Sequence, residues 1–298
     1  MTARMPVCGL TVAEQFDRRA GRIATRDFLL REVGRRLLAR LEYIRLEPHR
    51  VLDVGCGLGR ARTDLLAIHP SARWIGVELS ERMARAGRSE QRDALGLQRW
   101  WRGAPEWLVA DAAHLPIPDG SVDLLYSNLM LHWHAAPHAV FPEWKRVVRV
   151  DGLLLFSCFG PDTLKELRAA AAMALPHAAP MPFVDMHDFG DMLVASGFAT
   201  PVMDVETLTL TYRSAPQLLD EVRALGANVR ADRWPALPSG QQARALLKAL
   251  AERADTDGRI ALTFEVAYGH AWKPQPREAG VSSIPVDVLR RQLSRGKS

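Results

Sequence analysis

The run Asp53-Val54-Gly55-Cys56-Gly57-Leu58-Gly59 combines residue types and a spacing that suit the binding of a ligand. Glycine lets the backbone turn tightly and lets a ligand approach without hindrance from a Cβ atom. A helix that begins after such a turn directs free N–H groups at whatever the turn holds. A dinucleotide fingerprint would need its third glycine at the position of Arg60, whereas Gly59 follows Gly57 by two residues. The simpler alternative is an ordinary glycine turn of an α/β fold.

Two further acidic residues follow apolar runs later in the chain. Glu78 ends the run 73–78, and Asp111, with Ala112 after it, follows the run 107–110. The carboxyl ends of parallel strands open onto one crevice, where a carboxylate can accept hydrogen bonds from both hydroxyls of a ribose. Each carboxylate alone could equally be a solvated strand end. Three in this order, counting Asp53, predict one ligand site.

Short apolar runs that alternate with helical segments must hold these residues in place. The first half predicts strands at 50–54, 73–78, 107–110, 121–127 and 152–157. Such runs are typical of parallel strands covered by helices on both faces, so we expect a doubly wound, mostly parallel α/β sheet. The second half predicts helices at 162–173, 185–196, 215–225 and 241–253. It also predicts strands at 201–212 and 260–272. We expect the late strands to close the sheet in antiparallel fashion.

The chain then divides into three parts. Residues 1–47 form an N-terminal helical cover, with one helix over 11–46 that Pro48 ends. Residues 48–272 form the main domain, with a helical insertion on the substrate side at about 160–258. Residues 273–298 contain proline and arginine, and we expect a mobile tail.

Composition narrows the class of protein. The chain is 48% apolar and 24% charged, as in soluble globular proteins, and no apolar run approaches the ~20 residues that span a bilayer. Cys8, Cys56 and Cys158 are isolated, which predicts neither disulfides nor a zinc site and suits the cytoplasm. The net charge of +5 suits an acidic partner, although an arginine-rich solvated surface also explains it.

Three histidines crowd the segment after the fourth expected strand, at positions 132, 134 and 138. Histidine is a common metal ligand, but no matching set of carboxylates accompanies these three. We therefore expect surface or pocket-lining histidines and no metal.

The glycine turn, with Asp53 two residues before Gly55, resembles the cofactor motif of the class I S-adenosylmethionine-dependent methyltransferases. In that Rossmann-like family the loop wraps the methionine part of S-adenosylmethionine. The acidic residue before it helps to hold the loop and the cationic end of the ligand. By the same resemblance Glu78 binds the ribose hydroxyls and Asp111 contacts the adenine. The cofactor-binding residues that the resemblance implies are Asp53, Gly55, Gly57, Gly59, Glu78, Asp111, Ala112 and Asn128.

Beyond this site, the chain to about Trp272 resembles the malonyl-acyl carrier protein O-methyltransferases of biotin synthesis. The stretches that carry the resemblance are 16–20, 127–133, 159–167, 225–228, 262–264 and 268–269. It implies methyl transfer to the free carboxylate of a malonyl thioester on acyl carrier protein. The segment 127–130 lacks the Pro-Pro-aromatic element of the methyltransferases that act on adenine, so a nucleic acid is not expected as a partner. A membrane is not expected either, because no apolar run is long enough to span one.

Ile23 departs from this pattern, because the family has a tyrosine near that position. The respiratory complex I assembly factors that hydroxylate an arginine resemble the chain over the same regions, and a non-catalytic cofactor-binding protein is a third alternative. Methylation of a carboxylate needs no general base, so no acid–base residue is predicted. A cationic receptor for the substrate carboxylate is expected, and Arg18 and Arg230 are the candidates.

Overall fold

The computed structural model describes residues 5–23, 26–95, 106–175, 181–226 and 239–276. Its helices and strands, in chain order, are α1 (Gly9–Ile23), α2 (Phe28–Ala39), η1 (Arg40–Tyr43), β1 (Arg50–Val54), α3 (Ala61–Ile68), β2 (Arg73–Glu78), α4 (Glu81–Leu95), β3 (Glu106–Val109), β4 (Val122–Asn128), η3 (Leu131–Trp133), α6 (Pro137–Val147), β5 (Val148–Phe159), α7 (Lys165–Ala174), α8 (Met186–Ala195), β6 (Ala199–Tyr212), α9 (Ala215–Leu225), α10 (Gly240–Ala251) and β7 (Ile260–Trp272).

One seven-stranded sheet forms the centre of the molecule, in the order β3-β2-β1-β4-β5-β7-β6. The pairings among β1 to β5 are all parallel, and β7 lies antiparallel between β5 and β6. The order reverses at β1 and β4, which is where ligands bind in open α/β sheets. The expected doubly wound sheet with an antiparallel closing strand is thereby confirmed.

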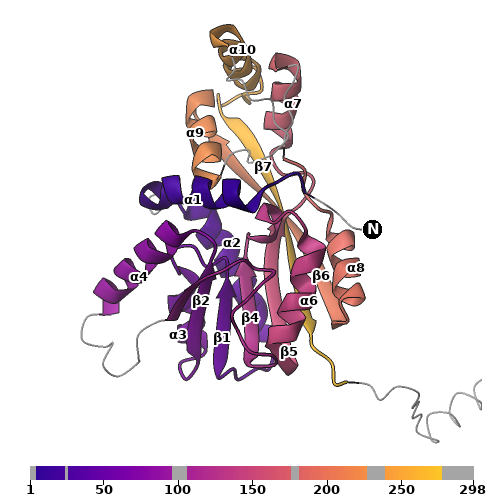
Figure 1. Ribbon diagram of the computed structural model, residues 1–298. Coiled ribbons are helices and arrows are strands. Elements are labelled where there is room, and N and C mark those ends of the chain that lie inside the picture. The colour runs from indigo at the N-terminus through magenta and orange to yellow at the C-terminus, as the bar shows by residue number, and fades with distance from the viewer. Residues whose placement is uncertain (1–4, 24–25, 96–105, 176–180, 227–238, 277–298) are drawn as a thin grey trace, which may run out of the picture.

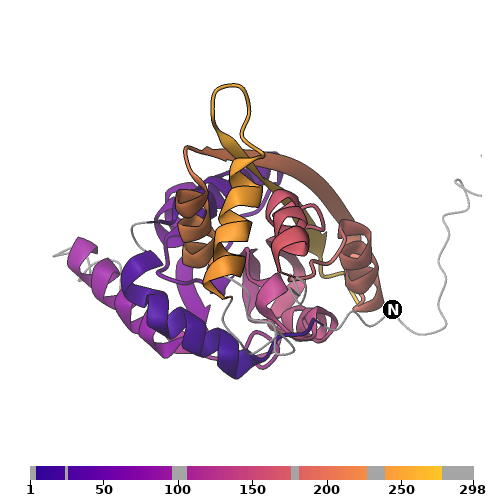
Figure 2. The same ribbon diagram turned by 90° about the horizontal axis from the view of Figure 1, so that it is seen from above.

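Helices cover both faces of the sheet, as Figures 1 and 2 show. One apolar core packs α6 and α8 on one face through Phe141, Trp144 and Phe189. The other core packs α2 and α3 on the opposite face through Leu37 and Leu65. Burial on both faces explains why the central strands are apolar along their whole length.

Helix α1 and the helices α7, α9 and α10 lie beyond the carboxyl ends of the parallel strands (Figure 1). Helices α7, α9 and α10 extend past the sheet, while α1 lies across the top of it in the view of Figure 1. The helix α1 packs against α4 and α9, and α10 packs against α7. These helices therefore lie on the side of the sheet where the glycine turn opens (Figure 1), whereas α2 and α8 pack on its faces, and the division into a cover, a main domain and an insertion stays a prediction.

The single helix expected over 11–46 is wrong, because the segment forms α1, α2 and the short η1. Two apolar stripes explain the break: Val12 and Ile23 are buried on α1, and Leu29 and Val33 are buried on α2. The step of six residues from Ile23 to Leu29 does not fit a 3.6-residue period, so one straight helix could not bury both stripes. The expected strand 152–157 is also longer and begins at Val148, directly after α6.

The described part of the chain contains no helix that is both long and apolar enough to cross a membrane. The start of the expected tail is tied to the sheet, because the Lys273 N–H donates to the Gly152 carbonyl at 3.0 Å. Residues 277–298 lie outside the described residues, so the expected mobile tail stays a prediction.

Candidate functional site

The glycine turn connects β1 to α3 in a conformation that requires glycine. Gly55, Gly57 and Gly59 have φ values of 74°, 55° and 68°. Residues other than glycine rarely adopt such positive φ values. The N–H groups of Gly55 and Cys56 donate to the Val77 carbonyl at 2.8 and 3.0 Å, which holds the turn against β2. A Cβ atom on Gly57 would meet only the Met83 Cε atom, at 3.7 Å. The turn is thus rigid and leaves open space at Gly57.

Glu78, at the end of β2, is 8% exposed and lies directly beside this turn. Its carboxylate accepts hydrogen bonds from the Gly57 N–H and the Ser80 N–H, both at 2.9 Å. Burial raises the pKa of this carboxyl, while the backbone N–H groups act in the opposite direction. Glu78 therefore braces the glycine turn and leaves further lone pairs for a ligand hydroxyl.

Asp53 is the most deeply buried acidic group of the site, at 2% exposure. Among the described residues nothing donates a hydrogen bond to its Oδ2 atom, and the Tyr126 hydroxyl also has no partner. Burial raises the pKa of Asp53 to about 8, because the charged form is poorly solvated. A cationic ligand group beside Asp53 would stabilise its charged form.

Asp111 follows β3 and is more open to solvent than the other two carboxylates. Its Oδ1 atom lies 3.3 Å from the His134 Nε2 atom and accepts a hydrogen bond from the Ala113 N–H at 2.8 Å. The contact with His134 lowers the pKa of Asp111. The neighbouring Ala112 is buried. The structure thus brings both residues to the same strand edge as Glu78, since Glu78 pairs with Val109 of β3.

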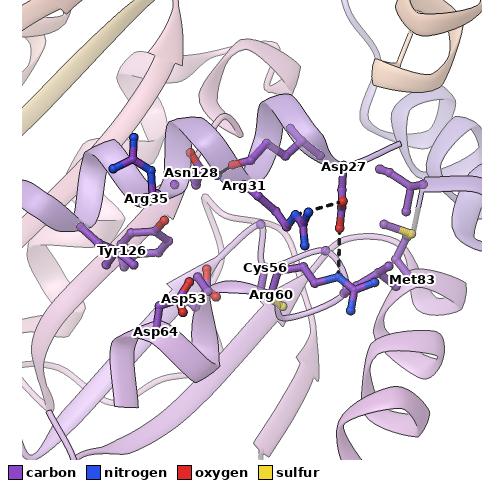
Figure 3. Close-up of a pocket in the computed structure, with 18 residues that line it drawn as sticks. Asp27, Arg31, Arg35, Asp53, Cys56, Arg60, Asp64, Met83, Tyr126 and Asn128 are labelled. Carbon is purple, nitrogen blue, oxygen red and sulfur yellow. Dashed lines mark hydrogen bonds and ion pairs between the residues drawn. The ribbon is translucent and has the colours of Figure 1, made fainter. Parts of the chain in front are cut away.

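A cavity of about 280 Å³ opens between α2 and the glycine turn. Figure 3 shows Arg31 and Arg35 on the α2 side and the carboxylates of Asp53 and Asp64 on the opposite side. Asp27 lies between the two sides. Its Oδ2 atom is 3.1 Å from the Arg60 Nε atom, and its Oδ1 atom is 3.3 Å from the Arg31 Nε atom. Cationic and acidic groups therefore face one space, which suits a ligand that carries both charges.

Helix α1 is fastened over this edge of the sheet. The Asp17 carboxylate accepts hydrogen bonds from the Ser80 hydroxyl at 2.5 Å and from the Arg82 N–H at 3.1 Å. Ser80 in turn caps α4 by accepting from the Met83 N–H at 3.1 Å. One residue before Asp17, the Phe16 ring packs edge-on against Trp133, with 5.4 Å between centroids. The helix thus connects the start of α4 with the segment after β4.

The family model for a methyltransferase domain matches residues 52–156, which contain the glycine turn and the strand-end carboxylates. The malonyl-[acyl-carrier protein] O-methyltransferase of Laribacter hongkongensis is 44% identical over 267 residues, covering 89% of this chain and 90% of that protein. Its namesake in Gallionella capsiferriformans is 42% identical, with 89% and 90% covered. The chain belongs to this family of O-methyltransferases.

Solved structures agree with the family at the level of the fold. The YcgJ protein of Bacillus subtilis superposes with a TM-score of 0.55 at 16% identity, covering 80% of this chain and 98% of that one. The [4+2]-cyclase SpnF reaches 0.51 at 20% identity and covers 82% of each chain. A cyclase on this fold illustrates that the fold alone does not determine the reaction.

The methyltransferase domain uses S-adenosylmethionine, and the residues present fit that cofactor. Open space at Gly57 admits a ligand against the backbone, and the unpartnered buried Asp53 suits a cationic group. The cavity between α2 and the turn offers arginines to a carboxylate and acidic groups to an amine. Ile23 lines this cavity and packs on Leu58 and Met83, so an apolar contact stands where the family has a tyrosine.

Asn128 also lines the cavity, but its side chain has structural partners. Its amide donates to the Leu30 carbonyl at 2.9 Å and accepts from the Ser157 hydroxyl at 2.7 Å. These bonds join α2 to the ends of β4 and β5. A cofactor contact of Asn128 stays a prediction, and it would have to use the backbone or a remaining lone pair.

The three histidines differ from one another. His132 is 2% exposed, and burial lowers its pKa to about 3. It packs against Trp133, Phe159 and Phe183, while His134 contacts Asp111. The described ranges contain no group of three or more His, Cys, Asp or Glu side chains that could hold a metal.

The arginine candidates also differ. Arg18 is exposed, its Nη2 atom lies 3.1 Å from the Glu14 Oε2 atom one turn earlier on α1, and it does not line the cavity. Arg230 lies outside the described residues.

The contribution of α2 was not predicted from the sequence, because the predicted cofactor residues all lie in the glycine turn or at strand ends. Asp27, Arg31, Gly34 and Leu38 recur at spacings of three and four and all line the cavity. Such a mixed stripe on a helix with a buried apolar face could have indicated a ligand-facing surface.

Proposed function

We propose that this protein transfers a methyl group from S-adenosylmethionine to the free carboxylate of a malonyl group carried by acyl carrier protein. The proposal rests on relatives that are 36–44% identical to the chain and are named malonyl-[acyl-carrier protein] O-methyltransferases. The similarity extends over about nine tenths of both chains, so it includes the cover and the insertion as well as the cofactor domain.

The cofactor residues have separable roles in this proposal. The glycine turn and the cavity beside α2 hold the methionine part, with Asp53 at its cationic end. Glu78 accepts hydrogen bonds from the ribose hydroxyls while it braces Gly57. Asp111 and Ala112 border the adenine. When bound, S-adenosylmethionine supplies a methyl group on a sulfonium, and its carbon–sulfur electron pair stays on sulfur as the carboxylate oxygen bonds to the methyl carbon.

The protein's own contribution to the reaction is alignment and exclusion of water. A malonyl carboxylate is already ionised at neutral pH, so no side chain has to remove a proton. Holding two reactants in line can supply most of the acceleration that such a displacement needs. Helix α1, fastened to α4 through Asp17 and packed on Trp133 through Phe16, is placed to close the site over the reactants.

The charge of the protein suits an acidic carrier protein as partner. The chain carries a net charge of +5 and has an isoelectric point near 9.4. Opposite net charges speed encounter, and salt screens this effect over about 10 Å at 0.1 M ionic strength. We expect malonyl-carrier protein to be a better substrate than a free malonyl thioester, and added salt to narrow the difference.

The direct test incubates the purified protein with methyl-labelled S-adenosylmethionine and either malonyl-carrier protein or a free malonyl thioester. Label on the malonyl group, released by mild alkali as expected for an ester, supports the proposal. An arginine hydroxylase instead predicts no methyl ester, dependence on an oxidant and a protein target. Rescue of a biotin-requiring strain that lacks its own methyltransferase provides a second readout. Absence of both label and rescue would exclude this substrate and leave the cofactor site standing.

A further inference from the structure

Arg19 lies on the inward face of α1, in the stripe that covers the site. Val12, Phe16, Arg19 and Ile23 follow one another at spacings of four, three and four, which places them on one face of a helix. Val12 and Ile23 are buried at 3% and 6% exposure, so this face is the one that packs onto the domain. An arginine in this stripe is exceptional, because the other three positions are apolar.

The neighbours of Arg19 in the stripe place it near the segments that follow β1 and β4. On one side, Phe16 packs edge-on against Trp133, in the segment that follows β4. On the other side, Ile23 packs with Leu58 of the glycine turn and Met83 of α4. Arg19 therefore lies between the end of β4 and the turn that holds the cofactor.

The guanidinium of Arg19 lacks the partners that other arginines in the site have. Its Nη1 atom is buried, and within the described residues it has no hydrogen-bond partner. Burial, together with the nearby Arg18, lowers the pKa of Arg19. The side chain of Arg18, by contrast, is 69% exposed and contacts Glu14. A buried charge without a partner is unfavourable unless an anion joins it.

We propose that Arg19 is the receptor for the carboxylate of the substrate, in place of the exposed Arg18. The proposal rests on the proposed function, in which the acceptor is a thioester-linked dicarboxylic acid with one free carboxylate. A guanidinium holds a carboxylate through two parallel N–H···O bonds, which orients the oxygens as well as binding them. An oxygen lone pair outside this pair of bonds then remains available to form the new bond to carbon.

The chemistry also decides which kinetic constant should respond. The carboxylate loses its negative charge as the methyl ester forms, so the cation interacts more strongly with the substrate than with the product. Interactions of this kind lower KM more than they raise kcat. They are weaker with the neutral methyl ester than with the charged substrate, which favours release of the product. Arg19 therefore selects a charged acyl group and releases a neutral one.

The experiment compares the binding of malonyl-carrier protein and acetyl-carrier protein, which lacks the carboxylate, in the presence of S-adenosylhomocysteine. We expect the wild type to bind the malonyl form about tenfold or more tightly, and Arg19→Gln to lose this preference. Arg19→Lys should retain part of it. Arg18→Gln, one residue away, is the matched control and should behave as the wild type. Because this readout needs no turnover, it stands even if the methyl-transfer assay fails.

Three results would overturn the proposal. One is a folded Arg19→Gln protein, by circular dichroism, that keeps the full malonyl preference. Another is an equal loss of affinity for S-adenosylhomocysteine, which would assign Arg19 to the cofactor. The last is a wild type that does not distinguish the two carrier proteins. In turnover assays the expected pattern is a KM for malonyl-carrier protein raised about tenfold or more, with a smaller change in kcat.

Discussion

The strand ends below the crevice and the helix α1 above it differ in how their charged groups are satisfied. Below, Glu78 accepts from two backbone N–H groups and Asp111 from another, so these carboxylates are held by the chain itself. Above, the buried Nη1 atom of Arg19 has no such partner in the described part of the structure. The strand ends are ready for a ligand, whereas α1 becomes fully satisfied only when an anion is present.

This difference separates the two ligands of the site. Substitutions at the strand ends should change the affinity for the cofactor, and substitutions on the inward face of α1 should change the choice of acyl group. Asp53 is the exception among the strand-end carboxylates, because it is buried with an unpartnered oxygen. Burial raises the pKa of both Asp53 and Glu78, but at Glu78 the backbone N–H groups oppose the shift, and at Asp111 the contact with His134 lowers the pKa, so Asp53 should give the clearest loss of stability with rising pH.

The largest effect is expected at the glycine turn. Gly57→Val would place two methyl groups in the open space beside Met83, and we expect the affinity for S-adenosylmethionine to fall about 100-fold or more, which is about 2.7 kcal/mol. Calorimetric titration measures this. The matched control is Gly120→Val, since Gly120 has a similar φ of 57° and lies against Arg149, away from the site. An unchanged affinity in folded Gly57→Val protein would remove the cofactor from this turn.

A smaller loss is expected at the end of β2. Glu78→Ala removes the acceptor of the Gly57 N–H together with the proposed ribose contact, and should weaken cofactor binding by about 1.5–3 kcal/mol. Glu78→Gln keeps one carbonyl oxygen of the same reach and should lose less. If both variants bind the cofactor as the wild type does, Glu78 only stabilises the turn.

The strand ends could be predicted from the sequence, because they depend on local patterns. Asp53, Glu78 and Asp111 each follow a short apolar run, and parallel strands bring the ends of such runs to one edge. The predicted bounds of β1, β2 and β7 match those observed. These strands are closely delimited by turns and prolines, which leave little freedom for their ends.

The cover could not be predicted in the same detail, because its geometry depends on packing between distant segments. The apolar stripe of α1 includes Arg19 and not Arg18, but only the packing of α1 against Trp133 and α4 shows that this stripe faces the site. The break between α1 and α2 was missed for the same reason. Its signal was a shift in the phase of two apolar stripes, which a list of apolar positions does not reveal.

Asp53 provides a test of burial through pH. Its pKa is about 8 in the folded protein against an ordinary value of 3.8, so the folded state binds a proton that the unfolded state has released between these values. This contribution to stability is fully present below about pH 4 and is lost as pH rises through 8, by about 1.4 kcal/mol per pH unit at most. Asp53→Asn removes the titrating group. Without cofactor, we expect the variant to gain at least about 1 kcal/mol relative to the wild type between pH 5 and 7 in urea unfolding. Parallel pH profiles for the two proteins would contradict the burial of an unpaired carboxyl.

The smallest effect concerns stability at α1 and has the opposite sign from the loss of function there. Methionine has nearly the length of the arginine stem and carries no charge, so Arg19→Met should keep the packing between Phe16 and Ile23. It also removes a partly buried guanidinium whose Nη1 atom has no hydrogen-bond partner within the described residues, which should raise the free energy of unfolding by about 0.5–1 kcal/mol. Arg18→Met, at the exposed neighbour of Arg19, should change stability by less than about 0.5 kcal/mol.

Urea unfolding of the wild type and the two variants, without ligands, measures the order of their free energies of unfolding. If Arg19→Met is the least stable of the three, the guanidinium has a partner in the free protein, and the contrast between α1 and the strand ends does not hold. If it is the most stable and also fails to distinguish malonyl from acetyl groups, then a charge selected for binding lowers the stability of the cover that holds it.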